Sequence, residues 1–407
     1  MPDVVFTNLA LLDTEAGTIA SGYEIAVTGN TISAVERGRI DPGSAEVIDL
    51  GGRTLMPGLI DCHVHFAPGA VLAQTHYMPS YIAARGVMWL KEMLRRGFTT
   101  ARDAGGADAG YRQAVERKIA LGPRLFVAGR AISQTGGHGD KRSAADMMCA
   151  CGASHGAIAR IADGVPEVRK AVRDEFRMGA NHIKVMAGGG VSSPSDAISH
   201  LQYSMEELEA LVDEAERHNS YCMAHVYTAA GIKRAVTAGI RTIEHGNFLD
   251  EEAAKLMAAR GAYLVPTLVT YRVDGANGAA IGFTPEAIAK NSEVLEAGTK
   301  SLEIAQAAGV KIAYGTDLAY SPKTHQPEEF LVRSEAQKPA DIIRSATVIG
   351  AEVVRMAGRI GVVKAGAFAD LLAIDGNPLE DLGLFQNDGE HMSIIMKDGA
   401  FVKNRLQ

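Results

Sequence analysis

The feature that most constrains the fold of this chain is a repeated alternation, through its middle, of short apolar runs with longer amphipathic segments. Short apolar runs are typical of strands buried on both faces of a sheet, and the segments between them have helical periodicity. Several segments end in a glycine just before the next run, as helix C-termini do. The eight runs are Leu59–Phe66, Thr99–Asp103, Arg124–Ala128, His182–Ala187, Tyr221–Val226, Thr242–His245, Tyr263–Leu268 and Lys311–Asp317.

Eight strand–helix units over about 300 residues are what a (β/α)8 TIM barrel requires, and we predict that α/β fold. An open doubly wound sheet is the alternative, but the strand count and the spread of polar residues over several strand ends favour the barrel. Three connections are longer than a barrel needs and would emerge at its C-terminal face, where barrel enzymes keep their sites: Ile132–Val165, Gly188–Gln202 and Thr270–Phe283. The expected helices are Met88–Arg96, Pro166–Met178, Met205–Asn219, Ala229–Ala238 and Pro285–Ala308.

Both ends of the chain read as short strands joined by turns. Tyr23–Val27 and Thr31–Val35 flank Gly29-Asn30, which is a hairpin signature, and Ala369–Ile374 and Met392–Met396 are similar apolar strand patterns near the C-terminus. We therefore predict one small accessory β-sandwich domain built from both termini. The expected boundaries are residues 1–56 and 359–407 for this domain and 57–358 for the barrel.

Composition and charge exclude several classes of protein. The chain has 407 residues, which suits a large barrel with an accessory domain, and its net charge is −7 without a run of Lys and Arg, which argues against a nucleic-acid partner. Because no apolar stretch reaches the roughly 20 residues of a membrane span, we expect no membrane partner. Residues 1–6 lack the pattern of a signal peptide, so a cytoplasmic location is expected; an export signal removed from a longer precursor stays an alternative.

The four cysteines form no obvious framework. Cys62 and Cys222 lie within apolar strand patterns and are expected to be small buried thiols. Cys149 and Cys151 fall in an expected loop, where two idle thiols in a reducing cytosol are the favoured interpretation and a disulfide or metal role is the alternative.

Metal-ligand residue types occur on five of the expected strands. His63 and His65 are one residue apart, so on a strand their side chains point to the same face, and neutral imidazole is a good ligand for zinc and related ions. Each such residue alone has an ordinary structural explanation, but together at one barrel rim they indicate a metal site. The set is His63 and His65 on the first strand, Lys184 on the fourth, His225 on the fifth, His245 on the sixth and Asp317 on the eighth.

The chain resembles the amidohydrolase superfamily of metal-dependent hydrolases over nearly its full length. The matching segments are Pro57–His65, Lys184 within His182–Val185, Ala224-His225, Ile243–Gly246 and Gly315–Asp317. More narrowly it resembles the prolidase-like branch of Xaa-Pro dipeptidases and carboxypeptidases. The segments that carry this likeness are Arg95–Thr100, Arg102–Gly106, Gln134–His138, Glu390-His391 and the stretch from there to Asp398-Gly399.

The resemblance implies a binuclear metal centre. His63, His65 and Asp317 would hold one divalent ion and His225 and His245 the other, with Lys184 bridging them as N6-carboxylysine, a carbamate formed with CO2. Zinc is the default ion, although these donors also accept manganese, cobalt or iron. A metal-bridging hydroxide would attack the amide, with Asp317 as the catalytic residue that takes its proton and passes it to the leaving nitrogen.

Within that branch, His138 and Tyr227 correspond by motif to residues that contact the substrate. Tyr227 lies two residues after His225 and therefore faces the same side of an extended segment. Arg102 and Arg272 are weaker candidates, chosen only because a guanidinium matches a carboxylate.

The implied reaction is hydrolysis of the amide bond to a C-terminal amino acid. The small-molecule substrates would be dipeptides such as Xaa-Pro, or N-acyl and aryl-amide amino acids of the ochratoxin type. A cyclic-amide hydrolase or a deaminase of the same superfamily is the first alternative, although mononuclear deaminases generally lack the lysine found here at Lys184. A non-catalytic barrel scaffold is a remote alternative. Homo-oligomers are common among such proteins, so a homo-oligomer is expected.

Overall fold

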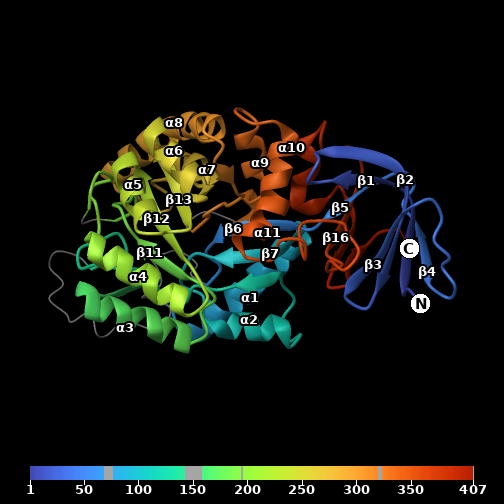
Figure 1. Cartoon of the computed structure of the whole chain (residues 1–407), viewed down its shortest axis with the longest axis horizontal. Helices are drawn as coiled ribbons and strands as arrows, with labels where there is room; N and C mark the ends of the chain where they lie inside the picture. Colours follow the sequence, from blue (N-terminus) through green and yellow to red (C-terminus); the bar gives the residue numbers. More distant parts are fainter. Residues whose placement is uncertain (68–76, 143–157, 194–195, 320–322, 407) are drawn as a thin grey trace.

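The computed structural model of the chain describes residues 1–67, 77–142, 158–193, 196–319 and 323–406. A barrel ringed by helices occupies one end of the molecule, and a sheet that contains both termini occupies the other (Figure 1). All of the eight expected runs in the middle of the chain contain a strand, and all of these strands pair in parallel. The predicted α/β barrel with an extra sheet from the termini is confirmed.

The barrel strands form two arcs. The first arc is a three-stranded sheet of β6 (Leu59–Val64), β7 (Phe98–Asp103) and β8 (Arg124–Phe126). The second has the order β10-β9-β11-β12-β13-β14-β15. Its strands are β9 (Ala131–Ser133), β10 (Ala159–Ile161), β11 (Ile183–Met186), β12 (Cys222–Thr228), β13 (Thr242–Phe248), β14 (Tyr263–Val265) and β15 (Lys311–Ile312).

The two arcs join at both edges. On one side β8 and β9 follow each other in the chain as two pieces of the third barrel strand, β8 pairing with β7 and β9 with β11. On the other side the segment after β15 bonds to β6, with Cys62 N donating to Tyr314 O at 2.8 Å and Asp317 N donating to His63 O at 2.8 Å. These bonds close the barrel and carry Asp317 to the end of β6.

Helices cover the outside of the barrel and bury their apolar faces against it. Gly179 and Gly239, which precede two of the strands, have φ of 97° and 99°, the left-handed conformation expected at helix C-termini. The helices around the barrel are α1 (Pro79–Arg95), α2 (Ala109–Glu116), α3 (Gly164–Arg177), α4 (Met205–Arg217), α5 (Ala229–Thr237), α6 (Glu251–Arg260), α7 (Leu268–Asn277) and α8 (Pro285–Ala307).

Two of the long connections differ from the sequence prediction. The connection Thr270–Phe283 was expected to be a loop, but most of it belongs to α7, whose Leu268, Val269 and Val273 are buried in the core. This helix begins after Thr267, which has φ of 51° and no capping side-chain hydrogen bond, so the usual helix-start signal is missing. The connection Ile132–Val165 contains β10 and most of β9, which are too short to be recognised from periodicity.

Between the barrel and the terminal sheet lies a group of short helical elements. The 3-10 turn η3 (Lys323–His325) and the helix α9 (Glu328–Arg333) follow the eighth strand, and the π-helical turn η4 (Ser345–Ile349) connects α10 (Pro339–Arg344) to α11 (Gly350–Val353). Two further 3-10 turns, η5 (Leu382–Phe385) and η6 (Asn387–Gly389), precede the last hairpin.

The terminal sheet has the order β18-β17-β16-β5-β1-β2-β3, with β4 also pairing with β1. β5 therefore joins the N-terminal strands to the C-terminal ones, and residues of β2, β3, β16 and β17 meet in one apolar core. We propose that residues 1–56 and 359–407 form this accessory domain around a barrel at 57–358. The strands are β1 (Val4–Asp13), β2 (Thr18–Thr28), β3 (Thr31–Arg37), β4 (Glu46–Asp49), β5 (Thr54–Pro57), β16 (Leu371–Ile374), β17 (Met392–Lys397) and β18 (Ala400–Asn404).

Cys62 and Cys222 are buried free thiols in strands, as expected, whereas Cys149 and Cys151 lie outside the described residues. Across the described ranges, no helix is both long and apolar enough to cross a bilayer.

Candidate metal centre and substrate pocket

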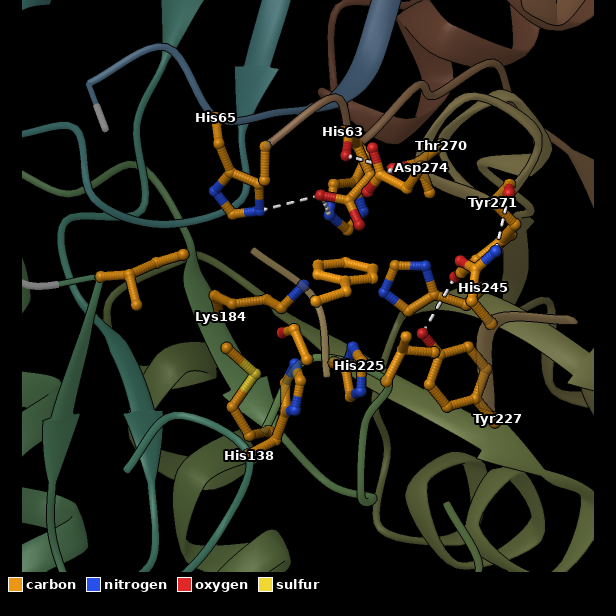
Figure 2. A pocket seen from close by; sticks show the side chains of 18 of the residues that line it. His63, His65, His138, Lys184, His225, Tyr227, His245, Thr270, Tyr271 and Asp274 are labelled. Atoms are coloured by element: carbon orange, nitrogen blue, oxygen red, sulfur yellow. Dashed lines mark hydrogen bonds and ion pairs between the residues drawn. The ribbon is translucent and has the colours of Figure 1, made fainter. Parts of the chain in front are cut away.

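One pocket at the C-terminal ends of the barrel strands collects the six predicted metal ligands and the two substrate residues predicted by motif, His138 and Tyr227. The residues around it converge from the two arcs (Figure 2). The predicted residues that line it are His63, His65, His138, Lys184, His225, Tyr227, His245 and Asp317.

His63 and His65 point into this pocket, and one ring nitrogen of each forms a hydrogen bond on the side away from it. His63 Nδ1 lies 2.7 Å from Glu244 Oε2, and His65 Nδ1 lies 2.8 Å from the carbonyl oxygen of Gly105. An acceptor on Nδ1 places the proton there and leaves the lone pair on Nε2. His63 Nε2 is fully buried and makes no hydrogen bond among the described residues, so its lone pair is available to a cation.

His225 and His245 repeat this arrangement from the second arc. His225 Nε2 lies 3.2 Å from the carbonyl oxygen of Gly189, and His245 Nδ1 lies 2.8 Å from Thr267 Oγ1. Their ring centroids are 4.6 Å apart. Burial lowers the pKa of His225 to about 3 and that of His245 well below its usual range, which keeps both imidazoles neutral, the state that binds metals.

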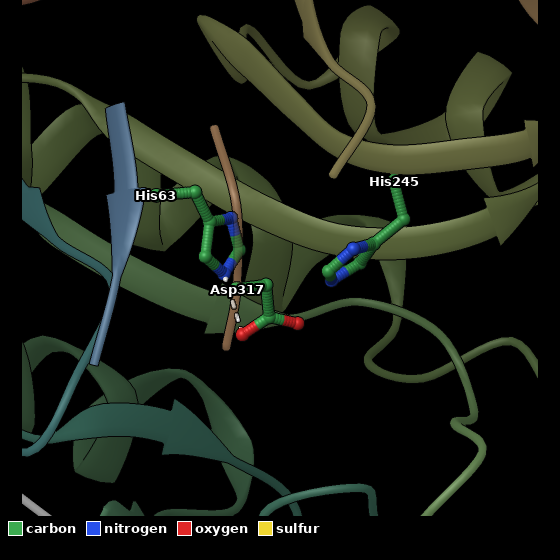
Figure 3. Close-up of side chains that lie close together, drawn as sticks. All are labelled: His63, His245 and Asp317. Carbon is green, nitrogen blue, oxygen red and sulfur yellow. Dashed lines mark ion pairs between the residues drawn. The ribbon is translucent and has the colours of Figure 1, made fainter. Parts of the chain in front are cut away.

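Asp317 faces the histidines from the segment after β15 (Figure 3). Its Oδ1 lies 3.4 Å from His63 Nε2 and 3.2 Å from His65 Nε2. Burial opposes ionisation of this carboxyl, but the imidazoles of His63 and His65 outweigh it and hold its pKa well below the usual range. Among the described residues, His63, His245 and Asp317 offer three donor atoms within 4.8 Å of one another, a spacing that fits a metal ion.

Lys184 points into the same pocket from β11 (Figure 2). Its side chain is almost fully buried, and burial lowers the pKa of its ammonium group to about 8. The donor set is thus four imidazoles, one carboxylate and one lysine that converge on a shared space. Nitrogen and oxygen donors of this kind suit zinc and other divalent transition-metal ions, so the residues fit the predicted centre.

Glu244 and Arg102 form a buried pair behind the histidines. Arg102 Nη2 donates to Glu244 Oε1 at 2.9 Å, and its Nε donates to the carbonyl oxygen of Cys62 at 2.6 Å. Burial raises the pKa of Glu244, but Arg102 and His63 outweigh it and lower it to about 2, so the group that orients His63 is a carboxylate. Arg102 therefore supports the site from within the barrel wall.

The prediction that Arg102 binds a substrate carboxylate is wrong, because its guanidinium is hydrogen-bonded to Glu244 and to the carbonyl oxygen of Cys62 inside the barrel. Arg272 is also wrong as a candidate. It is largely exposed on α7 and pairs with Glu335 at 2.5 Å, away from the pocket lining.

The two predicted substrate residues lie beside the second-arc histidines. The ring of His138 stacks on that of His225 at a centroid distance of 4.1 Å, and its Nδ1 lies 2.9 Å from Ser193 Oγ. Tyr227 packs edge-on against His225, and its hydroxyl accepts a hydrogen bond from the Tyr271 hydroxyl at 3.0 Å. Both side chains line the pocket next to the candidate metal centre.

Comparison with known proteins decides the family. The model of the amidohydrolase family matches residues 54–401. The chain belongs to the amidohydrolase family. The ochratoxinase of Aspergillus niger is 36% identical over 368 residues, which are 86% of this chain and 75% of that protein.

Solved structures place this amidohydrolase among prolidase-like relatives. An amidohydrolase crystal structure superposes with a TM-score of 0.97 at 46% identity, covering 99% of this chain and 100% of that one. A prolidase in complex with N-methylphosphonate-L-proline superposes with a TM-score of 0.96 at 46% identity, covering 98% and 99%. The predicted branch is confirmed, and the chain is a hydrolase of amide or peptide bonds.

Several residues of this amidohydrolase site were not found by sequence reasoning. Glu244 follows Ile243 in a strand whose next residue is His245, so alternation would place the two neighbours on opposite faces. His245 has φ of 74°, however, and this left-handed turn aims it into the pocket while Glu244 reaches His63 inside the barrel. Among the other lining residues that were missed, these come from loops and from α7 and α8, without a sequence signal: Lys141, Ser192, Thr270, Tyr271, Asp274, Phe283 and Asn291.

Proposed function

We propose that this amidohydrolase is a binuclear metal-dependent enzyme that cleaves the amide bond to a C-terminal amino acid. Its substrates would be dipeptides such as Xaa-Pro, or N-acyl and aryl-amide amino acids of the ochratoxin type. The observation that carries the proposal is the convergence of four histidines, Lys184 and Asp317 on one pocket. The prolidase and the ochratoxinase among its relatives support this substrate class.

His63, His65 and Asp317 would hold one metal ion. The close approach of both Nε2 atoms to the same carboxylate oxygen supports this grouping, because these three donors already share one small space. His225 and His245 would hold the second ion, each with its remaining ring nitrogen. His225 Nε2 donates to Gly189 O, which leaves Nδ1, and the hydrogen bond of His245 Nδ1 with Thr267 Oγ1 leaves Nε2.

Lys184 would join the two ions as a carbamate. The lysine ammonium first loses one proton, and the resulting amine combines with CO2 to an N-carboxylate with release of a second proton, so that a cation becomes an anion with oxygen donors. A buried ammonium between two divalent cations would be repelled, whereas the carboxylated form supplies negative charge to the centre.

Bound divalent ions would supply Lewis acidity, which lowers the pKa of water and polarises the carbonyl group. Asp317 would take the proton of the attacking water and deliver it to the leaving nitrogen, since an amine anion is a very poor leaving group. His138 and Tyr227 would hold the polar groups of the substrate beside His225, with a neutral imidazole and a phenol hydroxyl. Glu244 keeps His63 in the orientation that this chemistry needs.

The metal centre is tested by elemental analysis of the purified protein. We expect about two divalent ions per chain, and their loss together with activity in Lys184→Ala. His218→Ala is the matched control, because His218 caps α4 and stacks on Phe176 outside the pocket. A Lys184→Ala variant with two ions and full activity would contradict the proposed bridge.

The substrate class is tested by one screen of the holoenzyme. It compares Xaa-Pro, Xaa-Phe, Xaa-Lys and Xaa-Arg dipeptides with N-acyl amino acids and hydantoins. Turnover of acid-terminated amides is the expected result. Turnover of hydantoins alone would assign the chain to the cyclic-amide hydrolases, and an inert protein with an occupied metal centre would leave the scaffold alternative. A homo-oligomeric state and a cytoplasmic location remain predictions.

A further inference from the structure

The proposed substrates carry a carboxylate next to the scissile amide, and a carboxylate that enters a partly buried pocket needs a cationic partner. Two cationic side chains other than histidines line the pocket among the described residues, Lys141 and Lys184. Lys184 lies among the candidate metal ligands and is committed to the centre. Lys141 stands outside that group of ligands.

Lys141 lies three residues after His138 in the loop that follows β9. Its Nζ donates a hydrogen bond to Ser192 Oγ at 3.3 Å. It forms no ion pair within the part of the chain that the structure describes, and burial lowers its pKa to about 8. A desolvated ammonium group with one neutral partner favours an anion beside it.

The position of Lys141 relative to the reacting centre follows from His138. Both side chains line the pocket and bond to neighbouring serines, because Lys141 Nζ donates to Ser192 Oγ and His138 Nδ1 lies 2.9 Å from Ser193 Oγ. Because the ring of His138 stacks on His225, Lys141 lies on the side of the pocket next to the second-arc histidines.

The acidic groups nearby do not neutralise Lys141. Asp196 acts on its charge from a distance, but the Asp196 oxygens accept hydrogen bonds from Ser193 Oγ and from Gln202 Nε2. Asp274 lines another part of the pocket from α7, where it accepts a hydrogen bond from Thr270 and would repel a carboxylate. The charges of the pocket thus favour an anion beside Lys141.

We propose that Lys141 binds the C-terminal carboxylate of the substrate through a charge-assisted hydrogen bond and so selects amides that end in a free acid. Tyr227 can add a hydrogen bond to the same group but no charge. The inference rests on the proposed function and names the residue that would set its specificity for an amino-acid product.

The test measures kcat and KM of the holoenzyme for alanyl-proline and alanyl-prolinamide, or for the alanyl-phenylalanine pair if the screen favours phenylalanine. We expect the wild type to prefer the free acid. Loss of one charge-assisted hydrogen bond costs about 10- to 100-fold in kcat/KM. Lys141→Met should lose this factor for the acid, mainly through KM, with little change for the amide, so that the preference disappears.

Two further variants keep the test decisive. Lys141→Gln can still donate to Ser192 but carries no charge, so it should behave like Lys141→Met, and it replaces that variant if Lys141→Met fails to fold. Lys290→Gln is the matched control. Lys290 Nζ donates to Asp196 O at 2.7 Å outside the pocket lining, so its loss removes a nearby charge but should leave the preference for the acid.

The outcomes separate the two proposals. A wild type that prefers the acid, with variants at Lys141 that retain the preference, overturns the role of Lys141 and leaves the proposed function intact. A wild type without any preference for the acid overturns the proposed substrate class itself. If Lys290→Gln and Lys141→Gln lose the preference for the free acid equally, the total positive charge of the region, and not direct contact with Lys141, determines that preference. This result would contradict the inference.

Discussion

The two arcs of the barrel contribute differently to the pocket. The three-stranded arc supplies His63 from β6 and His65 just after it, whereas the seven-stranded arc supplies Lys184, His225 and His245 from three strands. The seven-stranded arc also positions its own histidines, because the partners of His225 and His245, Gly189 and Thr267, lie in its own loops.

His63 is the exception among the four histidines. Its Nδ1 is held by Glu244 of the other arc, and Glu244 is in turn held by Arg102 of the arc to which His63 belongs. Asp317 completes the link, since its backbone nitrogen donates to His63 O where the barrel closes. The difference teaches that one half of the candidate centre is built within an arc, and the other half exists only when the two arcs join.

The largest effect on activity is expected at Asp317, where the two arcs join. Asp317→Asn keeps the backbone bond to His63 and the size of the side chain, so the barrel should stay closed, but the carboxylate for proton transfer is lost. We expect kcat/KM to fall by about 10³-fold. Steady-state kinetics with the best substrate of the screen measure this, with Asp375→Asn in the terminal sheet as the control. Full activity in Asp317→Asn would refute the assigned proton transfer.

A second expectation concerns the cross-arc pair. Arg102→Met leaves the fully buried Glu244 carboxylate without its cation, which should lower the free energy of unfolding by roughly 3–5 kcal/mol. Urea denaturation of the metal-free protein measures this change in the free energy of unfolding. Arg272→Met is the matched control, because its exposed pair with Glu335 should contribute less than about 1 kcal/mol.

Adding Glu244→Gln to Arg102→Met should recover part of that loss, because no unpaired charge then remains in the barrel wall. Equal destabilisation by Arg102→Met and Arg272→Met would show that the two arcs do not depend on this pair.

The smallest effect is expected within the seven-stranded arc. Thr267→Val keeps the shape of the side chain but removes the hydrogen bond to His245 Nδ1. Loss of such a supporting contact should weaken metal affinity by about 10-fold. Competition with a chelator measures it, and Thr347→Val, a buried threonine outside the pocket lining, is the control. Unchanged affinity in Thr267→Val would mean that this arc does not position its own ligands in this way.

Much of the barrel could be predicted because its information is local. The apolar runs and the glycines before them mark strands and helix ends, and each of the eight runs contains a strand. The helix α7 was missed because Thr267 starts it in a left-handed conformation without a capping side chain. The strands β9 and β10 were missed because three residues are too few for a periodicity.

The site residues likewise divide into those with a local sequence signal and those without one. His63 and His65 were expected on one face of a strand from alternation, and both line the pocket. Arg102 was wrong as a substrate residue, since its charge is paired inside the barrel with Glu244, which lies about 140 residues further along the chain. No local pattern reveals a partner at that separation.

The sequence by itself determined which side chains end the barrel strands, because the alternation of a strand depends only on residues that are neighbours in the chain. The tertiary structure alone decided which nitrogen of each histidine faces the pocket, which carboxylate orients His63, and that Lys141 lines the same pocket as His138 with no ion pair to any described residue. These facts depend on closure of the barrel, where residues far apart in the chain exclude water from one another and so fix their hydrogen bonds and charges.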